Sequence, residues 1–428
     1  MKITKHKGEL TFNSKPPTIL HIDLNSCFAT VEQQANPHLR GKPIAVAAYT
    51  TPNGCILAPS VEAKRYGVKT GMRVKDGKLL CPGLIILSSD PWKYRNVHLS
   101  LRRLLSDYTA DFVPKSIDEF VLNLEGYPCL RKGEREVKNA MFEVGREIKK
   151  RIKKEIGEWL TVSVGIAPNR FLAKLASGLH KPDGLDEINK DNYLNCYLKL
   201  KLTDLPYIKT RNAIRLAGMG IYSVVDFYRA PLWKLKAAFE STNGYYWYLR
   251  LRGFSIDDIE FGRRSYGNSY ALPQQLTTLA ELSPILTKLV TKMSTRLRHA
   301  GYKTKGIHLA VSFRDGSFWH KGQTLSAVLF DTRDIYKRAY RILMECPFKK
   351  PVRDMAVSCF NLVKYSTLQL ELFENVVAKE KLSDSMDKIN ERWGDYVVTP
   401  ARMAKTETSV PDRIAFGGVK EIEEFTLQ

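Results

Sequence analysis

The alternation of apolar and polar positions over the first 180 residues predicts short strands separated by longer helices. Residues 18–22 form an apolar run that ends at Asp23, as expected for a buried strand. The other elements expected here are a turn and strand at 37–48, helices at 60–67, 92–110, 133–157 and 168–179, a hairpin or two short strands at 112–124, and a strand at 160–166. The order strand, helix, hairpin, helix and strand is a split βαβ arrangement of the ferredoxin type. Because central strands are neighbours in that fold, Asp23 and Asp118 are expected to lie close together.

Beyond residue 185 the pattern changes twice. Residues 186–260 lack strand-like alternation and are expected to be mostly helical, whereas residues 264–365 begin a second αβ unit. In that unit, residues 281–300 predict a helix with one apolar face and residues 306–313 predict a strand. A further helix is expected at 382–394. The predicted fold class is therefore α+β with several domains, as a length of 428 residues also indicates.

The charge of the chain indicates a class of binding partner. The chain carries 67 Lys and Arg against 45 Asp and Glu, a net charge of +22, and residues 264–365 alone carry +11. Such an excess of positive charge favours binding to nucleic acid. On the helix at 281–300, Lys288, Lys292 and Arg296 recur every four residues, and we expect them to contact a nucleic-acid backbone.

Other classes of protein are disfavoured. No apolar run approaches the roughly 20 residues that a membrane-spanning helix needs, and the basic residues 1–17 lack the apolar core of a secretory signal. The seven cysteines are scattered and form no C-x-x-C, so neither a zinc site nor a disulfide framework is indicated. The sequence thus predicts a cytoplasmic protein without a membrane partner.

The candidate chemistry lies in the segment Ser116-Ile117-Asp118-Glu119. It places two adjacent carboxylates inside an apolar, β-prone stretch, and Asp23 ends another such stretch. Carboxylates in apolar surroundings are costly unless they bind or pair with a cation. Three acids at strand ends in a basic chain indicate Mg²⁺ held against a polyanion, as two-metal phosphoryl transfer requires. We expect Asp23 and Asp118 to bridge two Mg²⁺ ions and Glu119 to complete the ion nearer the attacking hydroxyl.

Six motifs extend this pattern over residues 18–185. They are Ile22-Asp23-Leu24-Asn25-Ser26-Cys27-Phe28, Asn36-Pro37-x-Leu39-x-Gly41-Lys42-Pro43, Glu62-Ala63-Lys64-x-Tyr66-Gly67-Val68-x-x-Gly71-Met72, Ser116-Ile117-Asp118-Glu119, Val162-x-Val164-Gly165-Ile166-Ala167-x-Asn169-x-x-Leu172-Ala173-Lys174 and Lys181-Pro182-x-Gly184. In this order they resemble the motifs of Y-family translesion DNA polymerases, in particular the bacterial impB/mucB/samB-like branch with polymerase IV and the polymerase V catalytic subunit.

The resemblance implies a right-hand polymerase. Its parts would be a ferredoxin-like palm at 1–29 and 90–185, small fingers at 30–89, a helical thumb at 186–260 and a separate αβ little finger at 264–365. The implied activity is template-directed DNA synthesis of low fidelity, without proofreading, for damage bypass in the SOS response. Its implied partners are primer–template DNA and deoxynucleoside triphosphates.

The resemblance also assigns roles to single residues. Asp23, Asp118 and Glu119 match the metal-binding carboxylates, and the carbonyl of Leu24 matches a backbone ligand of the same two Mg²⁺ ions. Phe28 matches the steric gate, an aromatic ring that leaves no room for a 2′-hydroxyl.

Other matching positions concern the nucleotide and the DNA. The amides of Cys27 and Phe28 would face the triphosphate, Lys64 and Lys181 match nucleotide contacts, and Lys174 is expected at the DNA.

Two departures from the family pattern bear on nucleotide binding. Many members carry Tyr and Arg at the positions of Val61 and Lys64. Lysine keeps the charge but lacks the bidentate fork of arginine, which predicts a weaker hold on the triphosphate. The same pattern marks the polymerase V-like branch and leaves room for accessory subunits. Residues 52–57 would cover the nascent base pair, and their small and aliphatic side chains predict a site that tolerates altered template bases.

Two features outside the palm complete the comparison. The Gly-x-Gly turn that usually contacts a phosphate in the thumb is degenerate here, at residues 205–209. In the tail at 366–428, Gln369, Leu370, Leu372 and Phe373 match the sliding-clamp peptide Gln-Leu-x-Leu-Phe. A bacterial sliding clamp is therefore a further expected partner.

Two other functions share part of this pattern. A nucleotidyl cyclase with a ferredoxin-like palm would use the same carboxylates but needs neither a basic second domain nor a clamp peptide. A non-catalytic scaffold that binds DNA and the clamp would have no use for buried acids. Activity without a primer–template would favour the cyclase, and binding without activity would favour the scaffold.

Overall fold

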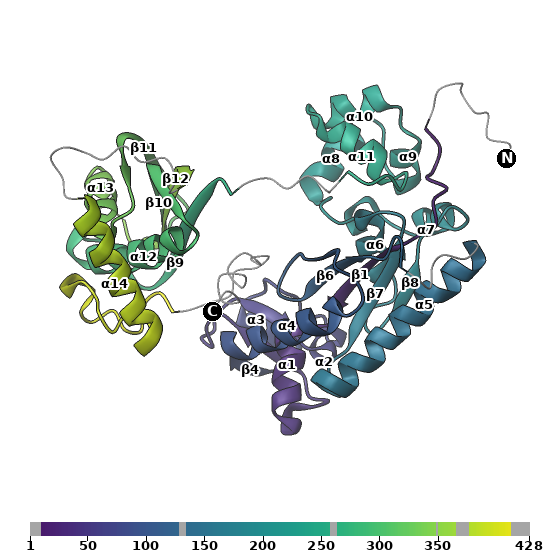
Figure 1. Ribbon diagram of the computed structural model, residues 1–428, viewed down its shortest axis with the longest axis horizontal. Coiled ribbons are helices and arrows are strands. Elements are labelled where there is room, and N and C mark those ends of the chain that lie inside the picture. Colours follow the sequence, from purple (N-terminus) through teal and green to yellow (C-terminus); the bar gives the residue numbers. More distant parts are fainter. Residues whose placement is uncertain (1–9, 128–133, 257–262, 348–349, 365–375, 412–428) are drawn as a thin grey trace. The chain divides into compact units, whose positions relative to one another are not determined.

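The computed structural model describes residues 10–127, 134–256, 263–347, 350–364 and 376–411 (Figure 1). These residues fall into two compact units, one with the described residues up to 256 and one from 263 to 411. None of the described helices is long and apolar enough to cross a membrane.

A five-stranded sheet forms the centre of the first unit. Its strands, in spatial order, are β5 (Phe112–Pro114), β6 (Glu119–Asn123), β1 (Ile19–Leu24), β7 (Val162–Ala167) and β8 (Leu185–Glu187). Strand β1 pairs antiparallel with both β6 and β7. This order confirms the ferredoxin-type arrangement that the sequence predicts. The short edge strand β8, parallel to β7, was not predicted.

Helices cover both faces of this sheet and sort the side chains of β1. On one face lie α4 (Pro91–Ser106) and α5 (Glu134–Arg151), the latter continued by a π-helix at Ile152–Ile156, and on the other lies α6 (Arg170–Ser177). Leu20, Ile22 and Leu24 pack into the core beneath α4 and α5. Since strand side chains alternate between faces, His21 and Asp23 share the opposite face with Ile19, beneath α6.

The rest of the first unit is a small sheet and a group of helices. The small sheet has the order β3 (Ile56–Pro59), β2 (Ile44–Ala47) and β4 (Ile85–Ser88), with α2 (Val61–Arg65) and α3 (Val74–Leu80) beside it, and α1 (Cys27–Ala35) follows β1. The later helices are α7 (Tyr193–Leu198), α8 (Thr210–Gly218), α9 (Val224–Arg229), α10 (Leu232–Phe239) and α11 (Asn243–Arg250). Over the described residues up to 256, and apart from the end of β8, they confirm the helical character expected for residues 186–260.

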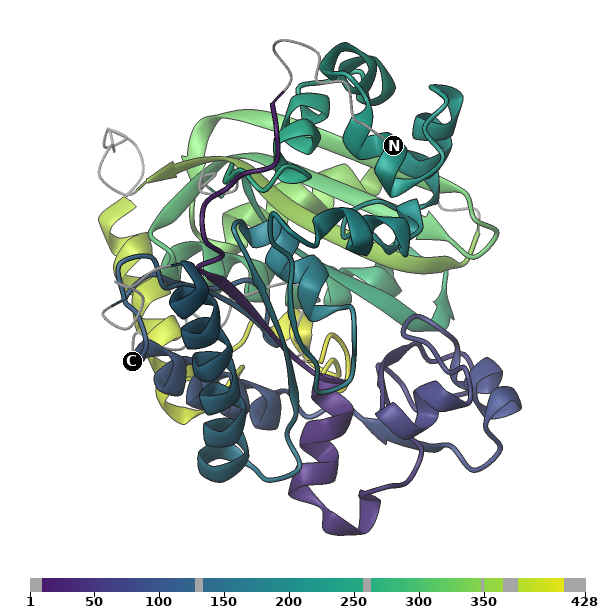
Figure 2. The same ribbon diagram turned by 90° about the vertical axis from the view of Figure 1, so that its right-hand side faces the viewer.

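The second unit is a four-stranded antiparallel sheet with helices packed on one face. In chain order its elements are β9 (Ser265–Leu276), α12 (Leu279–His299), β10 (Tyr302–Phe313), β11 (Phe318–Leu329), α13 (Thr332–Met344) and β12 (Val352–Lys364). The strands, in green in Figure 2, have the spatial order β11-β10-β12-β9. As the alternation predicted, Ile307, Leu309 and Val311 of β10 face the core between sheet and helices.

The described residues 376–411 are an integral part of this second unit. Helix α14 (Val376–Trp393) and a 3₁₀ turn (Ala401–Met403) pack against α12. Arg298 of α12 forms a bidentate ion pair with Asp387 of α14 at 2.7 and 2.8 Å, and both side chains are buried. A second buried cation, Lys303, pairs with Glu380.

This packing corrects one prediction made from the sequence. Lys288 is 4% exposed, and its ammonium group donates to the carbonyls of Thr406 at 2.6 Å and Glu407 at 3.1 Å. The expectation that Lys288 contacts DNA is therefore wrong, because the returning chain covers this face of α12. Lys292 and Arg296 are half-buried, and Arg296 donates to the carbonyl of Gly267.

The buried ion pair makes a testable prediction. Replacing Asp387 with alanine leaves the Arg298 guanidinium buried without its carboxylate, which typically costs about 3–5 kcal/mol. We expect a loss of that order in the free energy of unfolding, measured by urea denaturation of the full chain. The control is Asp384→Ala on the exposed side of the same helix, for which we expect a change within about 0.5 kcal/mol. Equal losses in both variants would contradict the prediction.

Candidate metal and nucleotide site

The three predicted carboxylates meet where β1 ends and β6 begins. In the register of these antiparallel strands, Asp23 stands directly opposite Glu119. Asp118 lies in the turn before β6, and its carbonyl accepts the amide hydrogen of Leu24 at 2.9 Å. The structure therefore brings together the residues that the sequence separates by 95 positions. The predicted neighbourhood of Asp23 and Asp118 is confirmed.

The turn at Asp118 is held by several hydrogen bonds. The hydroxyl of Ser116 donates to Oδ1 of Asp118 at 2.5 Å, and the amide of Lys115 donates to the carbonyl of Glu119 at 2.8 Å. Burial, together with the nearby charges of Asp23 and Glu119, raises the pKa of Asp118 to about 6. The raised pKa means that burial and the neighbouring carboxylates disfavour the ionised form of Asp118, and that nearby positive charge does not compensate for them.

Two lysines supply positive charge to the other acids. The ammonium group of Lys181 lies 2.6 Å from Oδ2 of Asp23. That of Lys174, on α6, lies 2.7 and 2.5 Å from the two carboxylate oxygens of Glu119. Burial alone would lower the pKa of Lys174, but the hydrogen bond and charge of Glu119 outweigh it and the pKa is raised. Sequence analysis expected Lys174 at the DNA, whereas the structure places it within the acidic cluster.

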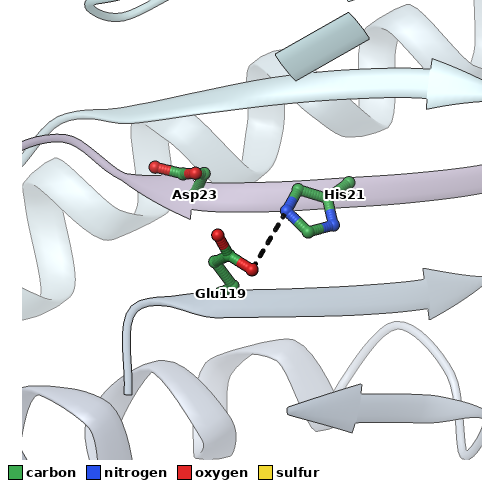
Figure 3. Close-up of side chains that lie close together, drawn as sticks. All are labelled: His21, Asp23 and Glu119. Atoms are coloured by element: carbon green, nitrogen blue, oxygen red, sulfur yellow. Dashed lines mark ion pairs between the residues drawn. The ribbon is translucent and has the colours of Figure 1, made fainter. Parts of the chain in front are cut away.

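His21 completes this cluster and was missed by the sequence analysis. Ligand atoms of His21, Asp23 and Glu119 all lie within 4.8 Å of one another (Figure 3). Nε2 of His21 is 3.9 Å from Glu119, and neither ring nitrogen has a hydrogen-bond partner among the described residues. Burial, followed by the charges of Lys174 and Lys181, keeps the pKa of His21 well below its usual value. The ring is therefore neutral, and its contact with Glu119 is not a full ion pair.

A pocket of about 510 Å³ opens beside the acids. Its lining includes both predicted metal-site and nucleotide-site residues, namely Asp23, Leu24, Cys27, Phe28, Lys64, Asp118 and Lys181. It also includes Val61 and three residues that the sequence did not single out for this role, Arg65, Thr70 and Ile117. Of the expected cover at residues 52–57, Leu57 lines the pocket. Burial, and then the charge of Lys181, lowers the pKa of Lys64.

Helix α1 presents its N-terminus to this pocket. Ser26 precedes the helix with φ of 51° and makes no side-chain cap, so the first amide groups of the helix are not satisfied by a capping side chain. Ser26, Cys27 and Phe28 all line the pocket. Free amides and the helix dipole together favour an anion at such a point. This geometry agrees with the predicted role of the Cys27 and Phe28 amides.

Phe28 is fixed by aromatic stacking. Its ring lies 4.2 Å from that of Tyr94 on α4, with an interplanar angle of 11°. The hydroxyl of Tyr94 donates to Oε1 of Glu32 at 2.9 Å. Because both partners are buried, the Phe28 ring has little freedom to move away from the pocket.

The chemistry of the donor set fits divalent cations. Carboxylate and carbonyl oxygens are the ligands that Mg²⁺ prefers, and Asp23, Asp118, Glu119 and Leu24 carry such oxygens where β1 ends and β6 begins. The ammonium groups of Lys174 and Lys181 already neutralise two of these acids in the protein alone. The raised pKa of Asp118 indicates that further positive charge would be favourable there.

The pKa of Asp118 predicts how metal binding depends on pH. Below about pH 6 the carboxyl of the metal-free protein is mostly protonated, so a metal ion must displace a proton. We expect the apparent dissociation constant for Mn²⁺ to rise by up to about tenfold per pH unit below 6 and to level off above 7. Titration of free Mn²⁺ by electron paramagnetic resonance between pH 5 and 8 measures this. A flat profile in the parent chain would contradict the prediction, and Asp118→Asn is the control that should lose the pH-dependent part.

The predicted clamp peptide, residues Gln369, Leu370, Leu372 and Phe373, lies outside the described residues.

Comparison with known proteins shows which family the chain matches. The model of the impB/mucB/samB family matches residues 22–178, and the model of the impB/mucB/samB family C-terminal domain matches residues 263–372. The chain is 31% identical to a DNA polymerase IV of Pelotomaculum thermopropionicum over 90% of this chain and 94% of the relative. It is 30% identical to DNA polymerase IV 1 of Bacillus subtilis over 92% and 95%.

Solved structures give the same fold. A chimera of the Y-family DNA polymerases Dbh and Dpo4 matches with a TM-score of 0.71 and 24% identity, covering 81% of this chain and 99% of the chimera. An insertion ternary complex of Dbh DNA polymerase matches over the same shares with a TM-score of 0.55. These likenesses confirm the α+β polymerase architecture that the sequence predicted.

Proposed function

The chain belongs to the impB/mucB/samB family and is a Y-family DNA polymerase of the translesion type, and from this premise we propose how its residues perform synthesis. Asp23, Asp118 and Glu119 would hold two Mg²⁺ ions together with the Leu24 carbonyl. The observation that carries this proposal is the pairing of Asp23 with Glu119 across β1 and β6, with Asp118 beside them at the pocket. Bound there, the ions would lower the pKa of the attacking hydroxyl and neutralise the triphosphate.

The protein's own residues bind and orient the substrates. The N-terminus of α1 and the ammonium groups of Lys64 and Lys181 receive the triphosphate, since all line the same pocket. Phe28, held by Tyr94, excludes a 2′-hydroxyl. With Val61 and a lysine at 64, the triphosphate is held by fewer directed hydrogen bonds than a tyrosine and an arginine would give.

We propose the domain roles in the same terms. Residues 1–29 and 90–185 act as the palm, 30–89 as the fingers, 186–260 as the thumb and 264–365 as the little finger. Primer–template DNA and deoxynucleoside triphosphates are the substrates. The solved relative Dbh has been described in a ternary complex, which supports this choice. The basic charge of residues 264–365 supports contact of the little finger with the DNA backbone.

Primer extension tests the function. The purified chain, Mg²⁺ and one deoxynucleotide at a time should extend a primer fastest when that nucleotide matches the template, and Glu119→Ala should abolish extension. Glu143→Ala, on the exposed side of α5, is the control and should leave the rate unchanged. DNA binding without any extension by the parent chain would instead favour a scaffold. Turnover of a nucleotide without primer–template would favour a cyclase.

The clamp is proposed from the peptide at residues 369–373. In such a peptide, Leu372 and Phe373 would enter an apolar groove, and Gln369 would hydrogen-bond at its rim. Replacing Leu372 and Phe373 with alanine should abolish the stimulation of primer extension by a bacterial sliding clamp and leave clamp-free extension intact. Glu371→Ala, at the unspecified position of the motif, is the matched control and should behave as the parent. Equal stimulation of all three proteins would overturn the proposal.

A further inference from the structure

His98 is a buried histidine behind the metal-binding turn. It lies on α4, one helical turn after Tyr94, and its side chain is fully buried. Its Nδ1 lies 2.9 Å from the carbonyl oxygen of Ile117. Its ring also stacks on Phe120, with centroids 4.9 Å apart and an interplanar angle of 25°. His98 therefore touches the residue before Asp118 and the residue after Glu119.

The hydrogen bond to Ile117 defines which ring nitrogen of His98 carries the proton. A carbonyl oxygen only accepts, so Nδ1 must carry the proton. Burial, and then the charge of Arg102, lowers the pKa of His98 even though the bond to Ile117 works in the opposite direction. The ring is thus neutral, with a bare Nε2 that has no hydrogen-bond partner among the described residues. A buried polar atom left unsatisfied is costly, and in a purely structural position an apolar side chain would avoid that cost.

The contact acts on the peptide group between Ile117 and Asp118. The carbonyl of Ile117 and the amide of Asp118 belong to one rigid plane. Holding the carbonyl therefore fixes the orientation of the peptide group that leads into Asp118, and with it the direction of the Asp118 side chain. On the other side, the carbonyl of Asp118 accepts the amide of Leu24. The backbone of Asp118 is therefore fixed at both of its peptide groups. His98 supplies the contact at the first of them.

We propose that His98 is a positioning residue that aims the Asp118 carboxylate at the metal ions. The proposal rests on the function proposed for Asp118. It assigns to α4 a double role, since the same helix face carries Tyr94 behind Phe28 and His98 behind the Asp118 turn. Partners that orient metal ligands from behind typically change metal affinity by about 10–100-fold when they are removed.

Two variants separate the hydrogen bond from the packing. His98→Phe keeps a ring to stack on Phe120 but loses the donor, whereas His98→Asn keeps a donor near the position of Nδ1 but loses the ring. The probe is Mn²⁺ alone, titrated into the full chain without DNA or nucleotide and followed by electron paramagnetic resonance. We expect the Mn²⁺ dissociation constant to rise about tenfold in His98→Phe and to stay within about twofold of the parent in His98→Asn.

A control removes the effect of general destabilisation. Leu101→Val, in the same buried cluster on α4, should lower the melting temperature and leave Mn²⁺ binding unchanged. Equal weakening of Mn²⁺ binding in both His98 variants, or unchanged binding with only a lower melting temperature, would overturn the proposal. If instead the parent chain binds no Mn²⁺ and extends no primer, the proposed function has failed and not the role of His98.

A measurement on the parent chain keeps the test independent of folding in the variants. Nitrogen-15 spectra of the histidine ring should show His98 protonated at Nδ1 and bare at Nε2 above pH 7. The opposite tautomer cannot donate to the Ile117 carbonyl and would overturn the proposal by itself.

Discussion

Replacing Asp118 with asparagine is expected to abolish primer extension and, in the metal-free protein, to raise stability. Loss of one shared metal ligand should lower the rate of extension by about 10³-fold or more. The stability gain follows from the pKa of Asp118, which is raised from 3.8 to about 6 in the folded chain. The folded state then binds the proton more tightly than the unfolded state, so the ionised carboxylate costs stability as the pH rises through this window.

The size of the gain can be estimated from the same shift. Discounted for partial exposure of the side chain, it amounts to about 1–2 kcal/mol above pH 7. The asparagine keeps a carbonyl oxygen that can accept from Ser116, so the turn should survive the change. Urea denaturation with a chelator at pH 5 and pH 8 measures the effect.

The pH dependence distinguishes the electrostatic cost of the ionised Asp118 carboxylate from a general change in packing. The difference between Asp118→Asn and the parent should be smaller at pH 5, where the parent carboxyl is largely protonated. A variant that is inactive and less stable than the parent at pH 8 would contradict the electrostatic account. Asp111→Asn, at an exposed position before β5, serves as the control and should change neither quantity substantially.

Replacing Phe28 with alanine is expected to admit ribonucleotides. The Phe28 ring is held against Tyr94 at 4.2 Å, and Tyr94 is itself held by Glu32. A ring fixed in this way would exclude a 2′-hydroxyl by a clash that it cannot relieve. Removing a clash of about 3–4 kcal/mol should lower the preference for deoxynucleotides by about 10²–10³-fold.

The preference is measured as the ratio of kcat/KM for a deoxynucleotide to that for the matching ribonucleotide. This ratio is independent of the fraction of active protein, which matters because loss of a buried ring also destabilises the core. Phe28→Tyr keeps the ring and should keep the preference. If Phe28→Ala discriminates as well as the parent, the gate lies elsewhere in the pocket.

The sequence predicted the centre of the site because its signals are local. An apolar run ending in Asp23 and an acid pair inside a β-prone stretch each require a buried strand end, and the ferredoxin-type order of elements makes those ends neighbours. The closeness of Asp23 to Asp118 therefore follows from periodicity and topology alone, whereas the register that sets Asp23 opposite Glu119 is seen only in the structure. The roles of single residues at the pocket came from the family resemblance.

What the sequence could not predict depends on contacts between distant segments. His21 lies in an apolar run and His98 on an amphipathic helix, where a histidine is easily taken for core, and only the paired strands and α4 bring them to the acids. Lys288 looked exposed because its own helix left that face polar, whereas residues 406 and 407 cover it.

The orientation of helix α14 also could not be predicted from its own sequence pattern. Its polar residues Ser383 and Asp387 are buried while Leu382 and Trp393 are exposed. A hydrophobic pattern would therefore orient it the wrong way round, because here the contacts that hold the helix are ionic.

The ion pairs of α14 have a consequence for the gene. A stop codon between codons 376 and 387 lies after the codons of all the proposed catalytic residues and therefore looks harmless at first sight. Yet such a truncated product would leave the guanidinium of Arg298 inside the protein without its carboxylate and, when the stop lies at or before codon 380, the ammonium of Lys303 as well. Nonsense mutations between codons 376 and 387 should therefore act as loss-of-folding alleles, and selection should preserve the reading frame at least through Asp387.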